Sequence, residues 1–202
     1  YAAVFTPTYS GSYQLSFNIT AANTNFNHPD NSIFLDDVRV LEGVSQLFQS
    51  GFETPALASS GAFTYPANGS GTVTTGDWAF TNYSGLIRGV NSGQWGPLNA
   101  AEGSQRGLVQ AYSGTLSKVT TASSLALVAG HSYTVTFYQS ARPGPVGNEG
   151  VLTYNVSFNI LAPVVTSDSS TGTSGTPFSF QIAATNSPTT YGATGLPSGL
   201  NV

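Results

Sequence analysis

Apolar and polar residues alternate with a period of two along several short stretches of the chain. The alternation covers residues 11–20, 131–139, 152–160 and 178–185, and in residues 32–41 it places Phe34, Asp36, Val38 and Val40 on one face. This period is typical of β-strands with one buried face, and clusters of Gly, Pro, Asn and Ser separate the stretches as turns. No stretch shows a sustained helical period with capping residues. We therefore expect an all-β chain built as a β-sandwich.

The composition supports a folded β-protein and excludes several kinds of partner. Charged residues make up 7% of the chain, yet aromatic residues reach 12%, which disordered segments rarely do. Only five Lys and Arg residues are scattered through a chain of net charge −4, so no basic surface for nucleic acid is expected. The absence of cysteine excludes disulfides, and no apolar run is long enough to predict a membrane span.

Several motifs occur in the order found in a family of bacterial exported and cell-surface domains. These motifs are SGFETPAL (50–57), DWAFTNYSGL (77–86), LNAAEGSQRGLVQ (98–110) and LALVAGHSYTVTFYQSAR (125–142). Together they resemble galactose-binding-like jelly rolls related to carbohydrate-binding modules. Such domains close with a strand like SIFLDDVRV, which here lies upstream, at residues 32–40.

This order predicts how the chain is divided. Residues 1–42 resemble the C-terminal strands of one jelly roll, and residues 48–160 resemble the N-terminal part of a second. Because a jelly roll without its closing strands leaves open sheet edges, residues 1–42 are expected to complete residues 48–160 as one composite sandwich. The chain starts with Tyr and contains no Met, so we expect it to be a piece of a longer polypeptide.

A second resemblance covers the C-terminal residues. A Pro-, Ser- and Thr-rich stretch at 161–177 predicts a boundary, and GTPFSFQIAATNSPTTYGATGLPSGL (175–200) resembles the first half of a bacterial He-PIG (cadherin-like) repeat. That resemblance implies a partial immunoglobulin-like β-sandwich over residues 163–202.

The jelly-roll resemblance implies a structural calcium ion held by scarce carboxylates. The matching residues are Glu53, Glu102, and Asp36 or Asp37. Calcium takes six to eight oxygen ligands, and carboxylates supply the charge. The alternative is that Asp36 caps a loop by accepting backbone N–H bonds while Glu53 is exposed. Asp37 is expected on the opposite strand face, as a surface residue.

The aromatic residues suggest where a ligand could bind. Trp78 alternates with Phe80 and is expected in the core, whereas Trp95 lies in a Gly/Pro turn. An exposed tryptophan can stack on a sugar ring, although Trp95 could equally fold back over the sandwich edge. Residues close in sequence that could hydrogen-bond sugar hydroxyls are Tyr83, Arg88 and Asn91.

No pattern in the chain predicts catalysis. His28 and His131 stand in turns, no G-x-S-x-G motif occurs, and the adjacent Asp36 and Asp37 should point apart. We therefore expect a non-catalytic carbohydrate-binding or adhesion module of a large exported bacterial protein, outside the cell or on its surface. Its expected partners are a glycan or cell-surface polysaccharide and the adjoining domains of the parent chain. The alternatives are a structural spacer and an accessory region of a glycoside hydrolase.

Overall fold

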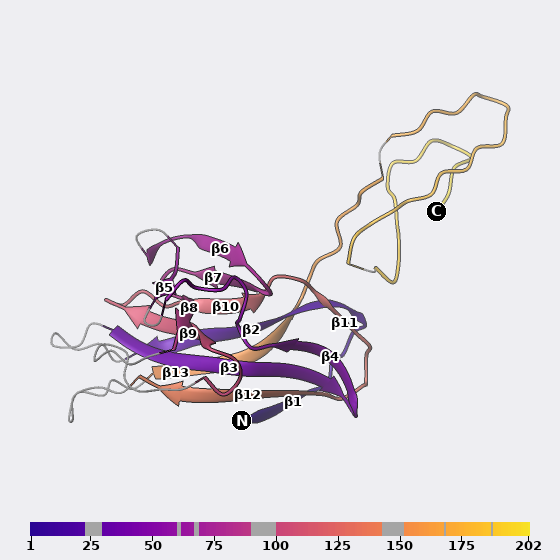
Figure 1. The fold of residues 1–202 in the computed structure, drawn as a ribbon. Helices are drawn as coiled ribbons and strands as arrows, with labels where there is room; N and C mark the ends of the chain where they lie inside the picture. The colour runs from indigo at the N-terminus through magenta and orange to yellow at the C-terminus, as the bar shows by residue number, and fades with distance from the viewer. Residues whose placement is uncertain are drawn as a thin grey trace.

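The computed structural model describes residues 1–22, 30–59, 62–66, 69–89, 100–142, 152–167, 169–186 and 188–202. Thirteen strands are assigned within these residues (Figure 1). They are β1 (Ala2–Phe5), β2 (Gly11–Ala22), β3 (Asp30–Glu42), β4 (Ser45–Ser50), β5 (Phe63–Thr64), β6 (Thr72–Thr75), β7 (Trp78–Thr81), β8 (Gly85–Arg88), β9 (Gln105–Tyr112), β10 (Lys118–Thr121), β11 (Leu125–Leu127), β12 (Tyr133–Ala141) and β13 (Leu152–Ile160). No helix of the described residues is long and apolar enough to cross a membrane.

The strands form two antiparallel sheets that pack face to face. A seven-stranded sheet has the order β1-β12-β3-β9-β8-β5, with β4 also pairing with β3. A six-stranded sheet has the order β11-β2-β10-β7-β6, with β13 also pairing with β2. The chain is thus all-β, as predicted, with the two-sheet architecture of a β-sandwich.

Residues 1–42 are integral to both sheets. β3 pairs with β12 along one edge, while its other edge pairs with β9 over residues 30–35 and with β4 over residues 38–42. β2 pairs with β10 and β11 on one edge and with β13 on the other. The strands before residue 42 therefore share both sheets with strands of residues 45–160, which is the arrangement that a composite sandwich requires.

The core lies between the two sheets and follows the predicted alternation of β2. Tyr13, Leu15, Phe17 and Ile19 of β2 are buried together. Trp78 is 1% exposed, packs with its ring parallel to that of Phe52 at 4.8 Å, and is therefore a core residue, as predicted.

The alternation predicted for β3 is wrong, because the strand contains a β-bulge. Asp36 pairs with Tyr138 and Arg39 pairs with Thr136, so two residues of β3 stand opposite one residue of β12. Asp37 adopts a positive φ of 43° at this point. A bulge inserts one residue and reverses which side chains face inward. Val38 and Val40 consequently face the core, whereas Phe34 and Asp36 face the outer side of the sheet.

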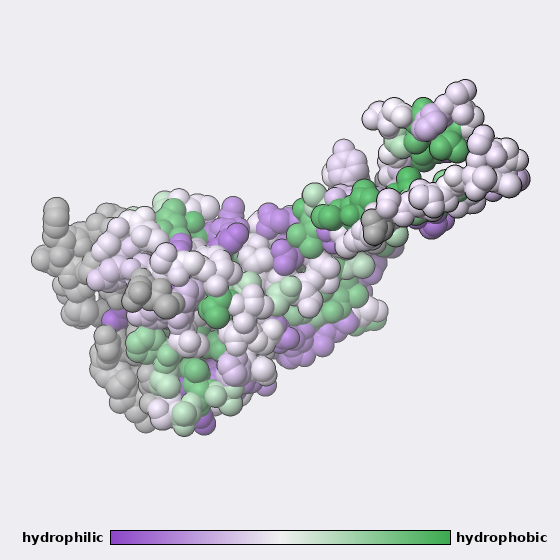
Figure 2. All heavy atoms as spheres, turned by 90° about the horizontal axis from the view of Figure 1, so that it is seen from above, coloured by the Kyte–Doolittle hydropathy of each residue, from purple (hydrophilic) through white to green (hydrophobic). Residues whose placement is uncertain are grey.

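The C-terminal residues form an extension that projects from the sandwich (Figure 1). The strand predicted over residues 178–185 is absent. The segment forms only an isolated bridge, which joins its Ala184 to Val165. A strand needs a neighbouring strand and an apolar face to bury against, and a lone alternating segment has neither. Apolar side chains such as Phe178 and Phe180 are instead partly exposed, and Figure 2 shows hydrophobic surface along the extension.

Candidate functional site

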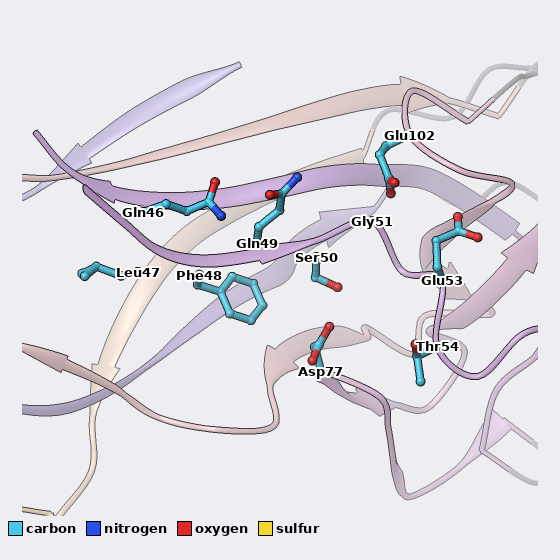
Figure 3. Close-up of a pocket in the computed structure, with 10 residues that line it drawn as sticks. All are labelled: Gln46, Leu47, Phe48, Gln49, Ser50, Gly51, Glu53, Thr54, Asp77 and Glu102. Atoms are coloured by element: carbon cyan, nitrogen blue, oxygen red, sulfur yellow. The ribbon is translucent and has the colours of Figure 1, made fainter. Parts of the chain in front are cut away.

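An open groove of about 500 Å³ runs along β4 (Figure 3). Its lining residues come from β4, the segment that follows it, the β6–β7 turn and the loop before β9. They are Gln46, Leu47, Phe48, Gln49, Ser50, Gly51, Glu53, Thr54, Asp77 and Glu102. A groove of this volume is in the usual range for small-molecule sites.

The aromatic core beneath the groove fixes the positions of its walls. Trp78, directly after Asp77, donates its indole N–H to the hydroxyl of Ser50 at 2.9 Å, which joins the start of β7 to the end of β4. The ring of Phe48 meets that of Trp78 edge-on at 5.5 Å. Asp77 and β4 are therefore held on opposite sides of the groove by buried contacts.

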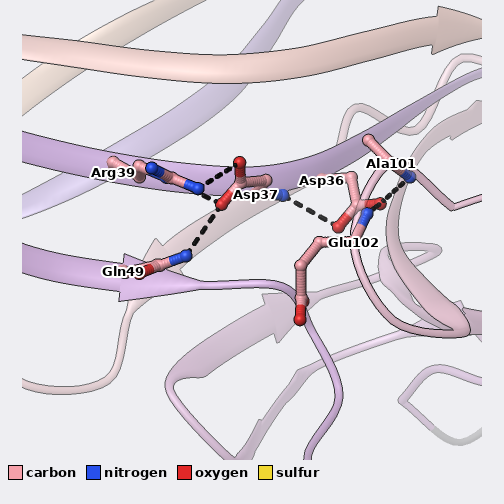
Figure 4. A network of polar contacts seen from close by, with 6 residues as sticks. All are labelled: Asp36, Asp37, Arg39, Gln49, Ala101 and Glu102. Atoms are coloured by element: carbon pink, nitrogen blue, oxygen red, sulfur yellow. Dashed lines mark hydrogen bonds and ion pairs between the residues drawn. The ribbon is translucent and has the colours of Figure 1, made fainter.

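Two predicted carboxylates, Asp36 and Glu53, hold the same loop. Asp36 Oδ2 accepts hydrogen bonds from the backbone N–H of Ala101 at 2.5 Å and of Glu102 at 3.1 Å (Figure 4). Glu53 Oε1 accepts from the backbone N–H of Ser104 at 2.8 Å and of Gln105 at 2.7 Å. Asp36 and Glu53 lie on either side of the predicted junction at residues 42–48. Both therefore bind the same loop, at residues 101–105.

The conformation of this loop depends on a glycine. Gly103 has a φ of +62°, and a Cβ atom at this position would lie 2.3 Å from the Glu53 carboxylate. The left-handed conformation and the close approach of Glu53 both favour glycine here. The neighbouring residue Glu102 places its carboxylate over Gly51. A Cβ atom on Gly51 would lie 1.6 Å from Oε2 of Glu102.

Asp36 is buried, and its environment changes its proton affinity. Burial raises the pKa of Asp36 to about 6, and the nearby Glu102 carboxylate also raises it, against the lowering effect of three backbone N–H donors. Those donors are the N–H groups of Glu102, Asp37 and Ala101. Asp36 therefore caps the loop, as one of the two predicted alternatives expects, whereas Glu53 is half-buried rather than exposed.

Asp37 is engaged in a separate ion pair. Its two oxygens accept hydrogen bonds from Nε and Nη2 of Arg39, both at 2.9 Å, and Oδ1 also accepts from the amide of Gln49 at 3.0 Å (Figure 4). Arg39 and Gln49 stand opposite each other in the β3–β4 register. Because Val38 and Val40 face the core, Arg39 and Gln49 lie on the outer face of the sheet. Asp37, which binds both, therefore shares that face with Asp36, contrary to the prediction, and links β4 to β3.

The four carboxylates predicted to bind calcium have different surroundings in the structure. Asp36, Asp37 and Glu53 already accept hydrogen bonds, and only the Glu102 carboxylate is exposed. Within the described ranges, no group of three or more Asp, Glu or His side chains is arranged to hold a metal ion. A structural calcium ion stays a prediction, which a melting experiment with added calcium and with chelator would test.

Two of the four predicted sugar-binding residues, Tyr83 and Arg88, are described by the structure and do not line the groove. Tyr83 precedes β8, and its ring contacts the rings of Tyr65 and Tyr112. Arg88 ends β8 and donates a hydrogen bond from Nη1 to the backbone carbonyl of Leu57. Trp95 and Asn91, as well as His28, lie outside the described residues. His131 is exposed in a turn, as predicted, beside the carboxylate of Glu42.

The sequence did not single out Gln46, Gln49, Asp77 or Arg106 as site residues. The groove residues Gln46, Gln49 and Asp77 form no recognisable sequence motif, because polar residues are common on short exposed strands and in turns. Arg106 had a detectable signal, because it is one of five basic residues and the only charged residue of the stretch 105–112. No protein-family model, curated protein or solved structure matches the chain, so both family resemblances stay predictions.

Proposed function

We propose that the chain is a non-catalytic glycan-binding module and that the groove along β4 binds the sugar. The observation that carries this proposal is the lining of the groove. Side chains that both donate and accept hydrogen bonds stand beside side chains that only accept, over a partly exposed apolar floor. Sugars present the matching chemistry, with hydroxyl groups around the ring and apolar C–H faces.

The individual side chains suit this role. The amides of Gln46 and Gln49 can each donate to and accept from hydroxyl groups, and the carboxylates of Asp77 and Glu102 accept hydroxyl protons. Phe48 and Leu47 supply apolar surface for a ring face. Three carboxylates in one groove would repel a polyanion, so this groove favours a neutral glycan.

A glycan array probed with the full chain tests the proposal. We expect binding to neutral oligosaccharides, and a drop of about 3- to 10-fold in affinity for Gln46→Ala and for Asp77→Ala, the range of one or two lost hydrogen bonds. Asn155→Ala, on the exposed side of β13, is the matched surface control and should bind as the parent does.

Two outcomes would contradict the proposal. No binding to any neutral glycan would favour the alternative of a structural spacer. Binding that is lost in Trp95→Ala but unchanged in Gln46→Ala and Asp77→Ala would move the site from the groove to residues 91–99.

A further inference from the structure

Arg106 is a buried charged side chain without a hydrogen-bond or ion-pair partner among the described residues. It is 2% exposed, and its Nε, Nη1 and Nη2 atoms are all buried and receive no hydrogen-bond partner from the part of the chain that the structure describes. A buried guanidinium group is normally paired, because an unpaired charge away from water strongly destabilises the folded state. Burial accordingly lowers the pKa of Arg106, although the charge of Asp36 opposes this effect.

The strand register explains which groups surround Arg106. Phe34 pairs with Leu108 and Leu35 with Gly107, so Asp36 and Arg106 come next in the register, on the same outer face of the sheet. The guanidinium carbon lies 4.7 Å from the centre of the Phe34 ring. Such a cation–π contact stabilises the charge but leaves the N–H donors unused.

Asp36 does not neutralise Arg106 by an ion pair. Its carboxylate is directed at the backbone of Ala101, Glu102 and Asp37, from which it accepts three hydrogen bonds (Figure 4). The ion pairs of the described residues join Arg39 to Asp37 and His131 to Glu42. Within the described ranges, the planar set of Arg106 donors is therefore unsatisfied.

A small cavity of about 120 Å³ lies beside the Arg106 side chain. It is lined by Phe34, Asp36, Ala101, Arg106, Tyr138, Gln139 and Ser140. Since a water molecule occupies about 30 Å³ in the liquid, the cavity has room for a group the size of a carboxylate. Tyr138 borders the cavity and is 60% exposed, so this side adjoins the solvent.

We propose that this cavity is a binding site for a carboxylate group, which pairs with Arg106. The fork of guanidinium N–H donors matches a planar carboxylate with two parallel hydrogen bonds. Ser140 pairs with Phe34 in the β3–β12 register and can add a hydroxyl donor from the same face. The carboxylate belongs either to a small organic acid or to an acidic sugar residue of a glycan. This site is separate from the neutral-glycan groove along β4.

Thermal unfolding of the full chain with defined probes tests the site. Sodium acetate and sodium glucuronate should raise the melting temperature in a saturable way, whereas sodium chloride at equal ionic strength and glucose should not. Similar saturation by both carboxylates assigns the site to small acids, and saturation at a much lower concentration of glucuronate assigns it to acidic sugars. No shift beyond that of sodium chloride with either carboxylate overturns the proposal.

Substitutions at Arg106 separate binding from a structural role. Arg106→Met removes the buried charge and keeps the volume, so we expect equal or higher stability and no response to carboxylate. Arg106→Lys keeps the charge without the planar fork and should bind the carboxylate about tenfold more weakly. Arg39→Met, which removes a guanidinium from the paired, more exposed site, is the matched control and should respond as the parent does. Equal responses of the parent and Arg106→Lys would contradict the pairing even if Arg106→Met does not fold.

Discussion

Asp36 couples the stability of the sandwich to pH. Its pKa is raised to about 6 in the folded chain, while an aspartate in an unfolded chain has a pKa of about 3.9. Between these values the folded state binds one more proton than the unfolded state. The free energy of unfolding should therefore fall as the pH rises from about 4 to about 6. This contribution is fully present below pH 4 and is lost above pH 6.

Urea unfolding at a series of pH values measures this effect. The parent chain and Asp36→Asn share all other titrating groups, so the difference between their profiles isolates Asp36. We expect the parent to lose stability relative to Asp36→Asn between pH 4 and pH 6. Parallel profiles across this window would show that Asp36 is not a buried, protonatable group.

Gly103 should tolerate a side chain less well than another glycine of the same conformation. Gly103 and Gly114 both have positive φ, +62° and +81°, but a Cβ atom would collide with Glu53 only at Gly103. Gly114→Ala should cost about 1–2 kcal/mol through backbone strain alone. Gly103→Ala should cost about 1–3 kcal/mol more, because Glu53 must move from the loop. Equal losses in chemical denaturation would mean that the Glu53 contact does not constrain the loop.

At the scale of elements, the alternation of apolar and polar residues predicted strands correctly where the segment pairs with neighbouring strands of the sandwich. The stretches 11–20, 131–139 and 152–160 all form strands, since each has a partner in the sandwich. Alternation failed at Asp37, because a bulge arises from the pairing of β3 with β12 and not from the pattern of β3 alone. It also failed over residues 178–185, where no partner strand covers the apolar positions.

The candidate site residues, like the strands, could be predicted only in part from the sequence. Asp36, Glu53 and Glu102 came under consideration together because the jelly-roll resemblance implies a calcium site at the matching positions. The role of Arg106 depends on its cross-strand neighbours Asp36 and Phe34, which the linear sequence does not reveal. The groove combines three separate segments, so its lining follows only from the folded arrangement of β4, the β6–β7 turn and the loop before β9.

β2 and β13 carry nearly the same heptapeptide. YQLSFNI (13–19) and YNVSFNI (154–160) share Tyr, Ser, Phe, Asn and Ile. The two segments pair antiparallel about Ser16 and Ser157, which stand opposite each other. Asn18 donates to the hydroxyl of Ser157 at 3.2 Å, and Asn159 donates to that of Ser16 at 2.9 Å. The pairing therefore has local pseudo-twofold symmetry, with equivalent hydrogen bonds on its two sides.

Equivalent residues of these two strands should differ in their contribution to stability. Phe17 is fully buried in the central strand β2, whereas Phe158 of β13 is half-buried beside Phe5. Phe17→Ala should lower the free energy of unfolding by about 3–5 kcal/mol. Phe158→Ala should cost about 1–2 kcal/mol, in proportion to its smaller buried surface. Urea denaturation of both variants checks this order, and a larger loss for Phe158→Ala would contradict the greater contribution assigned to the buried Phe17.

At the scale of the whole molecule, the sandwich and the C-terminal extension are held by different contacts. The main buried core of the sandwich combines residues of β2 and β3 with residues of strands between 78 and 137. In the extension, Thr166 donates to the carbonyl of Ala183 and Thr185 donates to that of Val164, so these bonds join the extension to itself. Leu161, which leaves β13, donates to the carbonyl of Ser12 and marks the point where the chain departs from the sandwich.

Removal of the extension should therefore leave the sandwich intact. We expect a chain of residues 1–161 to unfold cooperatively, with a urea midpoint close to that of the full chain, because the buried core lies before residue 161. Its m-value should be equal or slightly smaller, since the extension buries little apolar surface that unfolding would expose. The opposite truncation, which removes residues 1–42, takes away β2 and β3 and should abolish cooperative unfolding. If residues 43–202 still unfold cooperatively while residues 1–161 do not, the core is closed by the extension rather than by the N-terminal strands.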